Sequence, residues 1–328
     1  MTRRILGAIF GAIAIGAAVC VPTAGADGLP VPGVVTPYDG VPGPHGTNYV
    51  TNSEGDTTTV SKLGTEGTLR SERVSGDFTV PAVALDGSPA GLSADGSTLA
   101  LIKPRNSFPQ GQTRLLILNS RDLSIARRID LNGDFSFDAI SPSGSRLYFI
   151  EYLSPHDPTR YAVRAYDLKE GRMLSNPIVD PDEPAGEMRG YPMTRVTSPD
   201  GRWAYTLYDG AGKKPFVHAL DTTRGRAVCV DLDGLVKPND VPRIVMRMSS
   251  DGGELTLATP KGVAAVIDTE TLEASSPPVV RPASNGDGSG GGFPWMLIVV
   301  AMAVGLAGGG AVLLTRHRRA SGLATPDA

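Results

Sequence analysis

The sequence predicts an all-β fold built from repeated four-stranded units, and three observations carry this prediction. Its 328 residues include 40 glycines and 27 prolines, far above the ordinary share of about 12%, which is typical of short strands joined by turns. A Ser-x-Asp-Gly-type turn recurs at residues 93, 141, 198 and 249. A strand-like run that ends in Asn or Asp recurs at 119, 167, 221 and 268. Two independent markers therefore keep nearly the same spacing along the chain.

Each repeat begins with the turn, and the copy at 198 shows why these residues form one. Pro199 presets the φ of the second turn position, Asp200 can bond its own backbone, and Gly201 accepts a left-handed conformation without steric cost. The run from Trp203 to Leu207 is apolar on both faces, which indicates a strand covered on two sides. Repeats of about 50 residues with four strands each predict the blades of a β-propeller.

The first unit starts differently, with the tetrapeptide YVTN at 49–52. This stretch resembles the YVTN-type β-propeller repeat, in which such a tetrapeptide forms the second strand of a blade. The later Ser-Pro-Asp-Gly turns resemble the same family and its WD40-like relatives, although the His and Trp-Asp pair of true WD40 blades is missing. The resemblance covers about residues 47–275. It implies a propeller fold, which hosts binding modules and enzymes alike.

Ring closure is the open point of this fold prediction. The pattern gives three strands in the first unit and four in each of the next four, so 19 strands, one short of five closed blades. The missing inner strand would come from 32–40 or from 276–282. Both stretches contain prolines, which suit the edge of a sheet better than its interior.

The two ends of the chain predict export and a membrane anchor. A cationic start, an apolar run and a small-residue site predict a signal peptide over 1–26. An uncharged block that starts at Trp295 and a following basic cluster at 316–319 predict a transmembrane helix with a cytoplasmic C-terminus. The predicted order is a signal peptide at 1–26, a Pro/Gly-rich segment at 27–46, the propeller at 47–282, a Gly/Ser-rich linker at 283–294, the helix at 295–314 and a cytoplasmic tail at 315–328.

The predicted location is therefore the cell membrane, with one pass and an extracellular N-terminal domain. Ala301, Gly305 and Gly309 lie on one face of the predicted helix, a spacing of small residues that permits helix pairing. Small residues are also common in membrane helices for reasons of composition alone.

Composition and motifs restrict the kinds of ligand and catalytic site that the sequence predicts. A formal charge of −3 gives no basic footprint, so nucleic-acid binding is not expected. Removal of the signal peptide leaves Cys229 as the single cysteine, and none of the four histidines has metal-ligand spacing. We find no nucleophile elbow and no phosphate-binding glycine loop. The sequence therefore assigns no catalytic residue, no metal ligand and no cofactor.

Loop lengths predict which face of the propeller binds a partner. Turns between the first and second and between the third and fourth strands are short, whereas the other loops vary in length and lie on the opposite face. Binding residues usually occupy variable loops on a rigid scaffold, although loops also drift in length without a function. The candidate ligand-binding residues are Phe108, His156, Arg160, Arg189 and Tyr191.

These observations favour a recognition or scaffolding module at the cell surface that binds a protein or an envelope polymer. One alternative is a membrane-anchored hydrolase of the lactonase sort, because secreted lactone-hydrolysing enzymes also use propellers. Another is an accessory subunit of a membrane complex that pairs through the helix face at Ala301, Gly305 and Gly309.

The predicted topology has a direct test. Protease added to intact cells is expected to cut the glycine-rich linker at 283–294 and to release nearly the whole chain. The measurement is an immunoblot of cell pellet and supernatant. Full protection, in cells whose envelope admits the protease, would contradict the topology.

Overall fold

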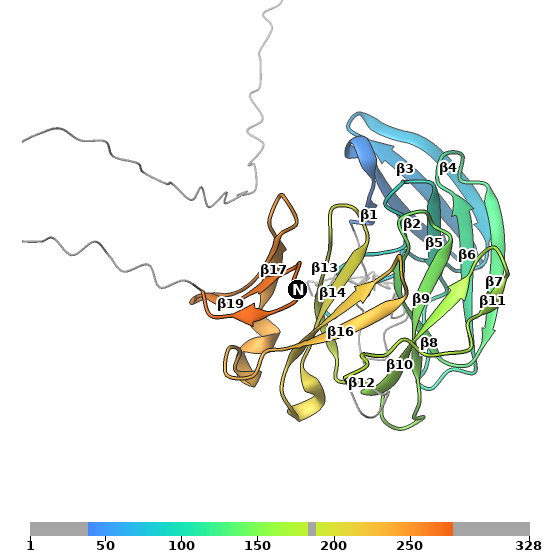
Figure 1. Ribbon diagram of the computed structural model, residues 1–328. Helices are drawn as coiled ribbons and strands as arrows, with labels where there is room; N and C mark the ends of the chain where they lie inside the picture. The colour runs from blue at the N-terminus through green and yellow to red at the C-terminus, as the bar shows by residue number, and fades with distance from the viewer. Residues whose placement is uncertain (1–38, 183–187, 278–328) are drawn as a thin grey trace, which may run out of the picture. The chain divides into compact units, whose positions relative to one another are not determined.

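The computed structural model describes residues 39–182 and 188–277, which belong to one compact unit. Five antiparallel sheets follow one another along the chain (Figure 1). They confirm the predicted all-β fold of about five blades. The predicted signal peptide, linker, transmembrane helix and tail lie outside the described residues. Within the described ranges, no helix has the length and apolar character needed to cross a bilayer.

The first sheet has four strands, and its inner strand comes from an unexpected place. The sheet contains β1 (Val41–Pro42), β2 (Asn48–Glu54), β3 (Thr57–Gly64) and β4 (Gly67–Ser75). Val41 pairs with Tyr49, so β1 is the strand that the count left missing. It follows directly after 32–40, inside the stretch 27–46 that the sequence assigned to a Pro/Gly-rich segment. Because β1 is only two residues long, it left no periodic signal.

The second sheet is the exception to the four-strand pattern. It contains β5 (Thr98–Ile102), β6 (Gln112–Asn119) and β7 (Ile125–Asn132). The fourth strand that the repeat predicts before residue 93 is reduced to an isolated bridge between Leu92 and Leu99. This bridge ends a hairpin over residues 79–92, which we call the central hairpin.

The central hairpin connects sheets that are not neighbours. Its two arms pair through the bridge between Ala82 and Pro89. At its tip, the N–H groups of Leu85 and Asp86 donate to the carbonyl oxygens of Pro192 and Met193, at 2.8 and 3.2 Å. These acceptors belong to the inner strand of the fourth sheet, so a segment of the second blade covers part of that strand's free edge.

The last three sheets follow the predicted repeat closely. The third contains β8 (Phe135–Ile140), β9 (Arg146–Tyr152), β10 (Arg160–Asp167), β11 (Arg172–Met173) and the additional β12 (Met188–Arg189), which pairs with β10. The fourth contains β13 (Pro192–Thr197), β14 (Trp203–Tyr208), β15 (Phe216–Asp221) and β16 (Arg226–Asp231). The fifth contains β17 (Val245–Met248), β18 (Glu254–Thr259), β19 (Gly262–Asp268) and β20 (Ala274–Ser275).

The repeated turns hold themselves together through their serine, a role that the sequence reasoning did not assign. In three copies the serine hydroxyl donates to the aspartate two residues later at 2.6 Å, as Ser198 does to Asp200. The same hydroxyl accepts the N–H five residues later, as Ser198 does from Trp203 at 2.8 Å. The four turn glycines have φ between +66° and +76°. Each turn is therefore fixed by local bonds.

The acidic strand ends have a similar local cause. Asp167, Asp221 and Asp268 each accept backbone N–H groups from the residues two and three positions later. These bonds form Asx turns, in which a side chain imitates a backbone turn. Hydrogen bonds to a carboxylate stabilise its charged form, and the backbone N–H groups of Thr271 and Glu270 lower the pKa of Asp268. The second repeat marker is thus the turn between the third and fourth strands.

Four apolar cores join neighbouring sheets. Each core contains buried side chains from two consecutive sheets, from the first pair to the fourth and fifth. Among the described residues, no such core joins the fifth sheet to the first. The free face of the fifth sheet exposes Val245 and Val263. The five-sheet count is therefore confirmed, whereas the described residues do not close the ring with a fifth core.

Substitutions of Gly201 and Gly212 test how the repeated turn packs against its neighbour. Gly201 and Gly212 both have positive φ, which costs an L-residue roughly 1 kcal/mol. A Cβ on Gly201 would also lie 2.4 Å from the Cβ of Ala94, whereas a Cβ on Gly212 meets nothing within 4 Å. We expect Gly201→Ala to lower the melting temperature clearly more than Gly212→Ala, measured by circular dichroism. Equal losses would mean that the two turns do not pack as described.

Candidate functional site

The variable loops gather at one end of the sheets, which we call the long-loop face. It contains the loops 103–111, 153–159 and 209–215 and the segment 188–192. In Figure 1 this face is at the lower end, near β12, whereas the β13–β14 and β17–β18 turns lie at the upper end. We call that opposite end the turn face.

Phe108 contacts Arg105, whose guanidinium is fixed by a buried ion pair. Arg105 and Asp134 form a buried ion pair with an Nη1–Oδ1 distance of 2.5 Å. The Arg105 guanidinium lies 5.7 Å from the ring centre of Phe108 and 5.3 Å from that of Tyr152. The two rings meet edge to face at 5.5 Å. Cation–π and aromatic contacts of this kind fix the loop 103–111 to the end of β9.

Arg160 and Arg189 are brought side by side. They stand opposite each other in the pairing of β10 with β12. Arg189 lies 3.8 Å from the Asp157 carboxylate, measured from Nη1 to Oδ2. The side chain and backbone of Thr159 donate to the same carboxylate and, with the nearby arginines, lower the pKa of Asp157. Asp157 therefore stays charged beside Arg189 at the rim.

Tyr191 occupies the next position around the face. It is half-buried, and its N–H donates to Asp209 Oδ1 at 2.8 Å. Tyr191 lines a small cavity of about 10 Å³ together with Tyr152, Tyr161 and Tyr208. That volume suits about one water molecule. Burial raises the pKa of the Tyr191 phenol, which keeps it a neutral hydrogen-bonding group.

The structure thus places the five candidate residues on three adjacent loop regions. Phe108 and Tyr191 are linked through Tyr152, which contacts the first and lines the small cavity with the second. His156 is exposed on the loop 153–159 and takes part in none of these contacts. Sequence reasoning missed Leu153, which exposes 45% of its surface on that loop. A leucine directly after a strand, in a run rich in Pro and Asp, was the available signal.

A buried polar cluster near the inner strands was also missed. Asp138 of β8 and Arg195 of β13 form an ion pair in which both side chains are at most 4% exposed. His218 of β15 is 1% exposed, and neither of its ring nitrogens has a hydrogen-bond partner among the described residues. A charged residue within an otherwise buried inner strand was the signal, since such a residue points to a specific partner.

His218 gives a prediction for stability against pH. Burial lowers the pKa of His218 from its ordinary 6.5 to about 4. Below pH 6.5 His218 therefore binds a proton in the unfolded chain, whereas in the folded chain it binds one only below about pH 4. The free energy of unfolding falls by about 3 kcal/mol over this window on account of His218 alone.

The measurement is urea unfolding of the wild type and of His218→Gln between pH 7 and pH 4. The variant is expected to lose less stability over this range. His156→Gln is the control, because His156 is exposed, and it should follow the wild type. An identical loss in wild type and His218→Gln would contradict the assignment.

The comparisons with known proteins assign this chain to no family and to no function. No protein-family model matches the sequence, and no curated protein matches it. Among solved structures, hydrazine synthase of Kuenenia stuttgartiensis is 17% identical with a TM-score of 0.43, over 69% of this chain and 62% of that one. The dihydro-heme d1 dehydrogenase NirN, in complex with DHE, is 13% identical with a TM-score of 0.45, over 73% and 45%.

A third similar structure is the β-propeller domain of Cps50 (Swd1) from Myceliophteria thermophila. It is 12% identical with a TM-score of 0.40, over 70% of this chain and 66% of that one. The chain spans less than two thirds of the length of each of these three proteins. At such identities the activities of these proteins say nothing about this chain.

Proposed function

We infer that this chain is a recognition module that binds a protein partner through the long-loop face. In this proposal the signal peptide exports the chain and the helix at 295–314 anchors it in the membrane. The YVTN-type character of residues 49–52 is part of the same proposal. The four buried cores then serve as a rigid scaffold for the loops.

The observation that carries the proposal is the anchored state of the loops. Arg105, held by its buried ion pair with Asp134, and Tyr152 both contact the ring of Phe108. Asp209 accepts the backbone N–H of Tyr191, and Arg189 lies 3.8 Å from the Asp157 carboxylate. Association is costly when side chains must be ordered first, so a face that is already ordered loses less. Aromatic residues and arginine also dominate binding hot spots.

A protein is favoured over an envelope polymer by the mixture of groups on the face. Leu153 is an exposed aliphatic group, and the arginines offer charged donors beside it. Protein interfaces combine an apolar centre with a polar rim in this way. Binding of a purified wall polymer, without a protein partner, would favour the alternative ligand.

The test is affinity capture from solubilised membranes, followed by titration of the partner obtained. Phe108→Ala and Tyr191→Ala are each expected to weaken binding by about 1 kcal/mol or more. Leu153→Ala is the third probe, because Leu153 is exposed and its truncation removes no side chain from the buried cores. Lys169→Ala, in a short turn on the turn face, is the matched control and should leave affinity unchanged.

Melting temperatures of all four variants separate lost binding from lost folding. A loss confined to Lys169→Ala would show that the wrong face had been chosen. Turnover of a lactone panel by the purified chain, with no partner captured, would favour the hydrolase instead.

A further inference from the structure

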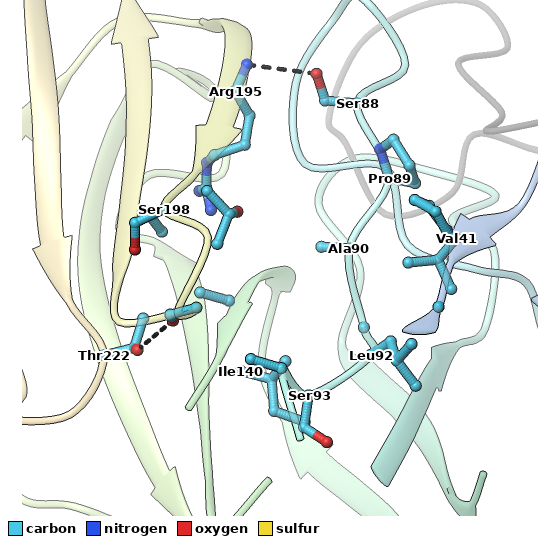
Figure 2. Close-up of a pocket in the computed structure, with 18 of the residues that line it drawn as sticks. Val41, Ser88, Pro89, Ala90, Leu92, Ser93, Ile140, Arg195, Ser198 and Thr222 are labelled. Carbon is cyan, nitrogen blue, oxygen red and sulfur yellow. Dashed lines mark hydrogen bonds between the residues drawn. The ribbon is translucent and has the colours of Figure 1, made fainter. Parts of the chain in front are cut away.

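A cavity beside the central hairpin has polar walls whose hydroxyl groups are already bonded. It has a volume of about 540 Å³, and Figure 2 shows Ser88, Ser93, Ser198 and Thr222 around it. Each of these four hydroxyls donates its proton to an acceptor within the protein. Pockets orient a ligand through a few polar groups that are left to bond with it. These four hydroxyls therefore have no donor left for a ligand.

A smaller groove, formed by the loop 103–111 and the start of β6, offers more donors. It has a volume of about 260 Å³, and we call it the loop groove. Its polar lining residues are Lys103, Asn106, Ser107, Gln110, Gln112 and Arg114. The two charged residues in this set are both basic. The lining of the groove is therefore suited to an anion rather than to a cation.

Strand pairing places these two basic residues opposite each other. The N–H of Lys103 donates to the carbonyl oxygen of Arg114 at 2.9 Å, which extends the pairing of β5 with β6. Arg114 in turn pairs with Asp130 of β7. Side chains directly opposite each other in an antiparallel pair share one face, with Cβ atoms about 4.5–5.5 Å apart. Two cations and one carboxylate therefore form a row across neighbouring strands.

Lys103 carries the unbalanced charge of this row. Asp130 lies 3.4 Å from Arg114, measured from Oδ1 to Nε. Lys103 is half-buried and makes no ion pair among the described residues. Asp134, at the base of the loop, is already paired with Arg105. Because like charges opposite each other destabilise a sheet, an anion bound between Lys103 and Arg114 would stabilise this one.

Arg114 has donors that its own contacts do not use. Its Nε and Nη2 donate to Gln112 Oε1 at 3.0 and 2.8 Å. Within the described part of the chain, both N–H groups of Nη1 and one of Nη2 remain. The Arg114 side chain is 50% exposed, so a ligand can approach it from solvent. Because Oε1 of Gln112 faces Arg114, the NH₂ of the same amide is a further donor at the groove.

The number of these donors favours a tetrahedral oxyanion over a carboxylate. The end of the Arg114 guanidinium that carries Nη1 and Nη2 can bind two oxygen atoms at once. A carboxylate has only these two oxygens. A phosphate group has at least three strong acceptor oxygens, and a sulfate group has the same shape. A third oxygen can therefore reach the Lys103 ammonium while the first two bind Arg114.

We propose that the loop groove binds a tetrahedral oxyanion, the phosphate or sulfate group of a ligand. Two of its oxygens accept N–H groups from Nη1 and Nη2 of Arg114, and a third accepts an N–H of the Lys103 ammonium. The amide of Gln112 borders the same site. This site goes beyond the recognition function proposed for the long-loop face and does not depend on a protein partner.

The test is equilibrium dialysis of radiolabelled inorganic phosphate with the purified full-length chain in detergent, at pH 7. The buffer has low ionic strength, because salt screens exposed charges. Bound phosphate is then displaced by methyl phosphate, by methyl sulfate or by acetate. We expect the better of the two esters to compete at least about tenfold more strongly than acetate. The identity of that ester distinguishes a phosphate source from a sulfate source.

Three variants locate the contact. Lys103→Gln and Arg114→Gln each remove one charge from the loop groove and should weaken phosphate binding at least about fivefold. Lys213→Gln is the matched control, because Lys213 is exposed on the loop 209–215 and does not line the groove. It removes the same charge and should bind phosphate as the wild type does. Melting temperatures verify that each variant is folded.

Four results would overturn the proposal. They are no measurable phosphate binding, displacement by acetate as strong as by either ester, unchanged binding in both groove variants, and an equal loss in Lys213→Gln. The last result would show a general effect of charge instead of a site.

Tyr191→Ala separates this proposal from the proposed function, because Tyr191 does not line the loop groove. This variant should bind phosphate normally even where it loses the captured partner. Failure of phosphate binding in the wild type, with a partner still captured, would reject the anion site and leave the proposed function standing.

Discussion

The ion pair between Asp138 and Arg195 is the constraint on which the centre of the molecule depends. It joins the inner strands of the third and fourth sheets, and its two side chains are at most 4% exposed. Removal of one partner from such a pair typically costs about 3–5 kcal/mol, because the other charge is left buried alone. Ser88 of the central hairpin also accepts the N–H of Arg195, at 3.3 Å. Arg195 therefore links the third sheet, the fourth sheet and the central hairpin.

The two ends of the sheets differ in how far their connections depend on contacts with other sheets. On the turn face, each serine and aspartate satisfies its own backbone, so these turns need few contacts from elsewhere. The opposite loops contain local bonds of the same kind at Ser154, Asp157 and Asp209, and they also make contacts with a neighbouring sheet, such as that of Arg105 with Tyr152 at the end of β9. A scaffold whose turns are self-sufficient tolerates change at its other end. The added contacts between sheets are what distinguish the irregular face from the regular turns.

Local chemistry was predictable from the sequence, and remote pairing was not. The turn at Ser198 and the strand end at Asp221 were predicted because their partners lie within five residues. Strand β1 was missed because it is only two residues long, and the central hairpin was missed because its partners are distant in the sequence, as for Leu85 with Pro192. The candidate loops were placed on one face by counting strands, whereas the contact of Phe108 with Tyr152 depends on two different sheets. The buried Oδ2 of Asp138, which has no hydrogen-bond partner among the described residues, has no signature in the sequence.

The central hairpin has a consequence for how the chain reaches this structure. Ser88 and Arg195 are 107 residues apart, so the hairpin is made long before its partner strand. During synthesis from the N-terminus, the first two sheets emerge with the tip of the hairpin still unpaired. Contacts of such long sequence separation slow folding, because the closure entropy is lost before the contact is gained. Assembly of the centre therefore waits for the fourth sheet, and a chain interrupted before β13 would expose an open edge that favours aggregation.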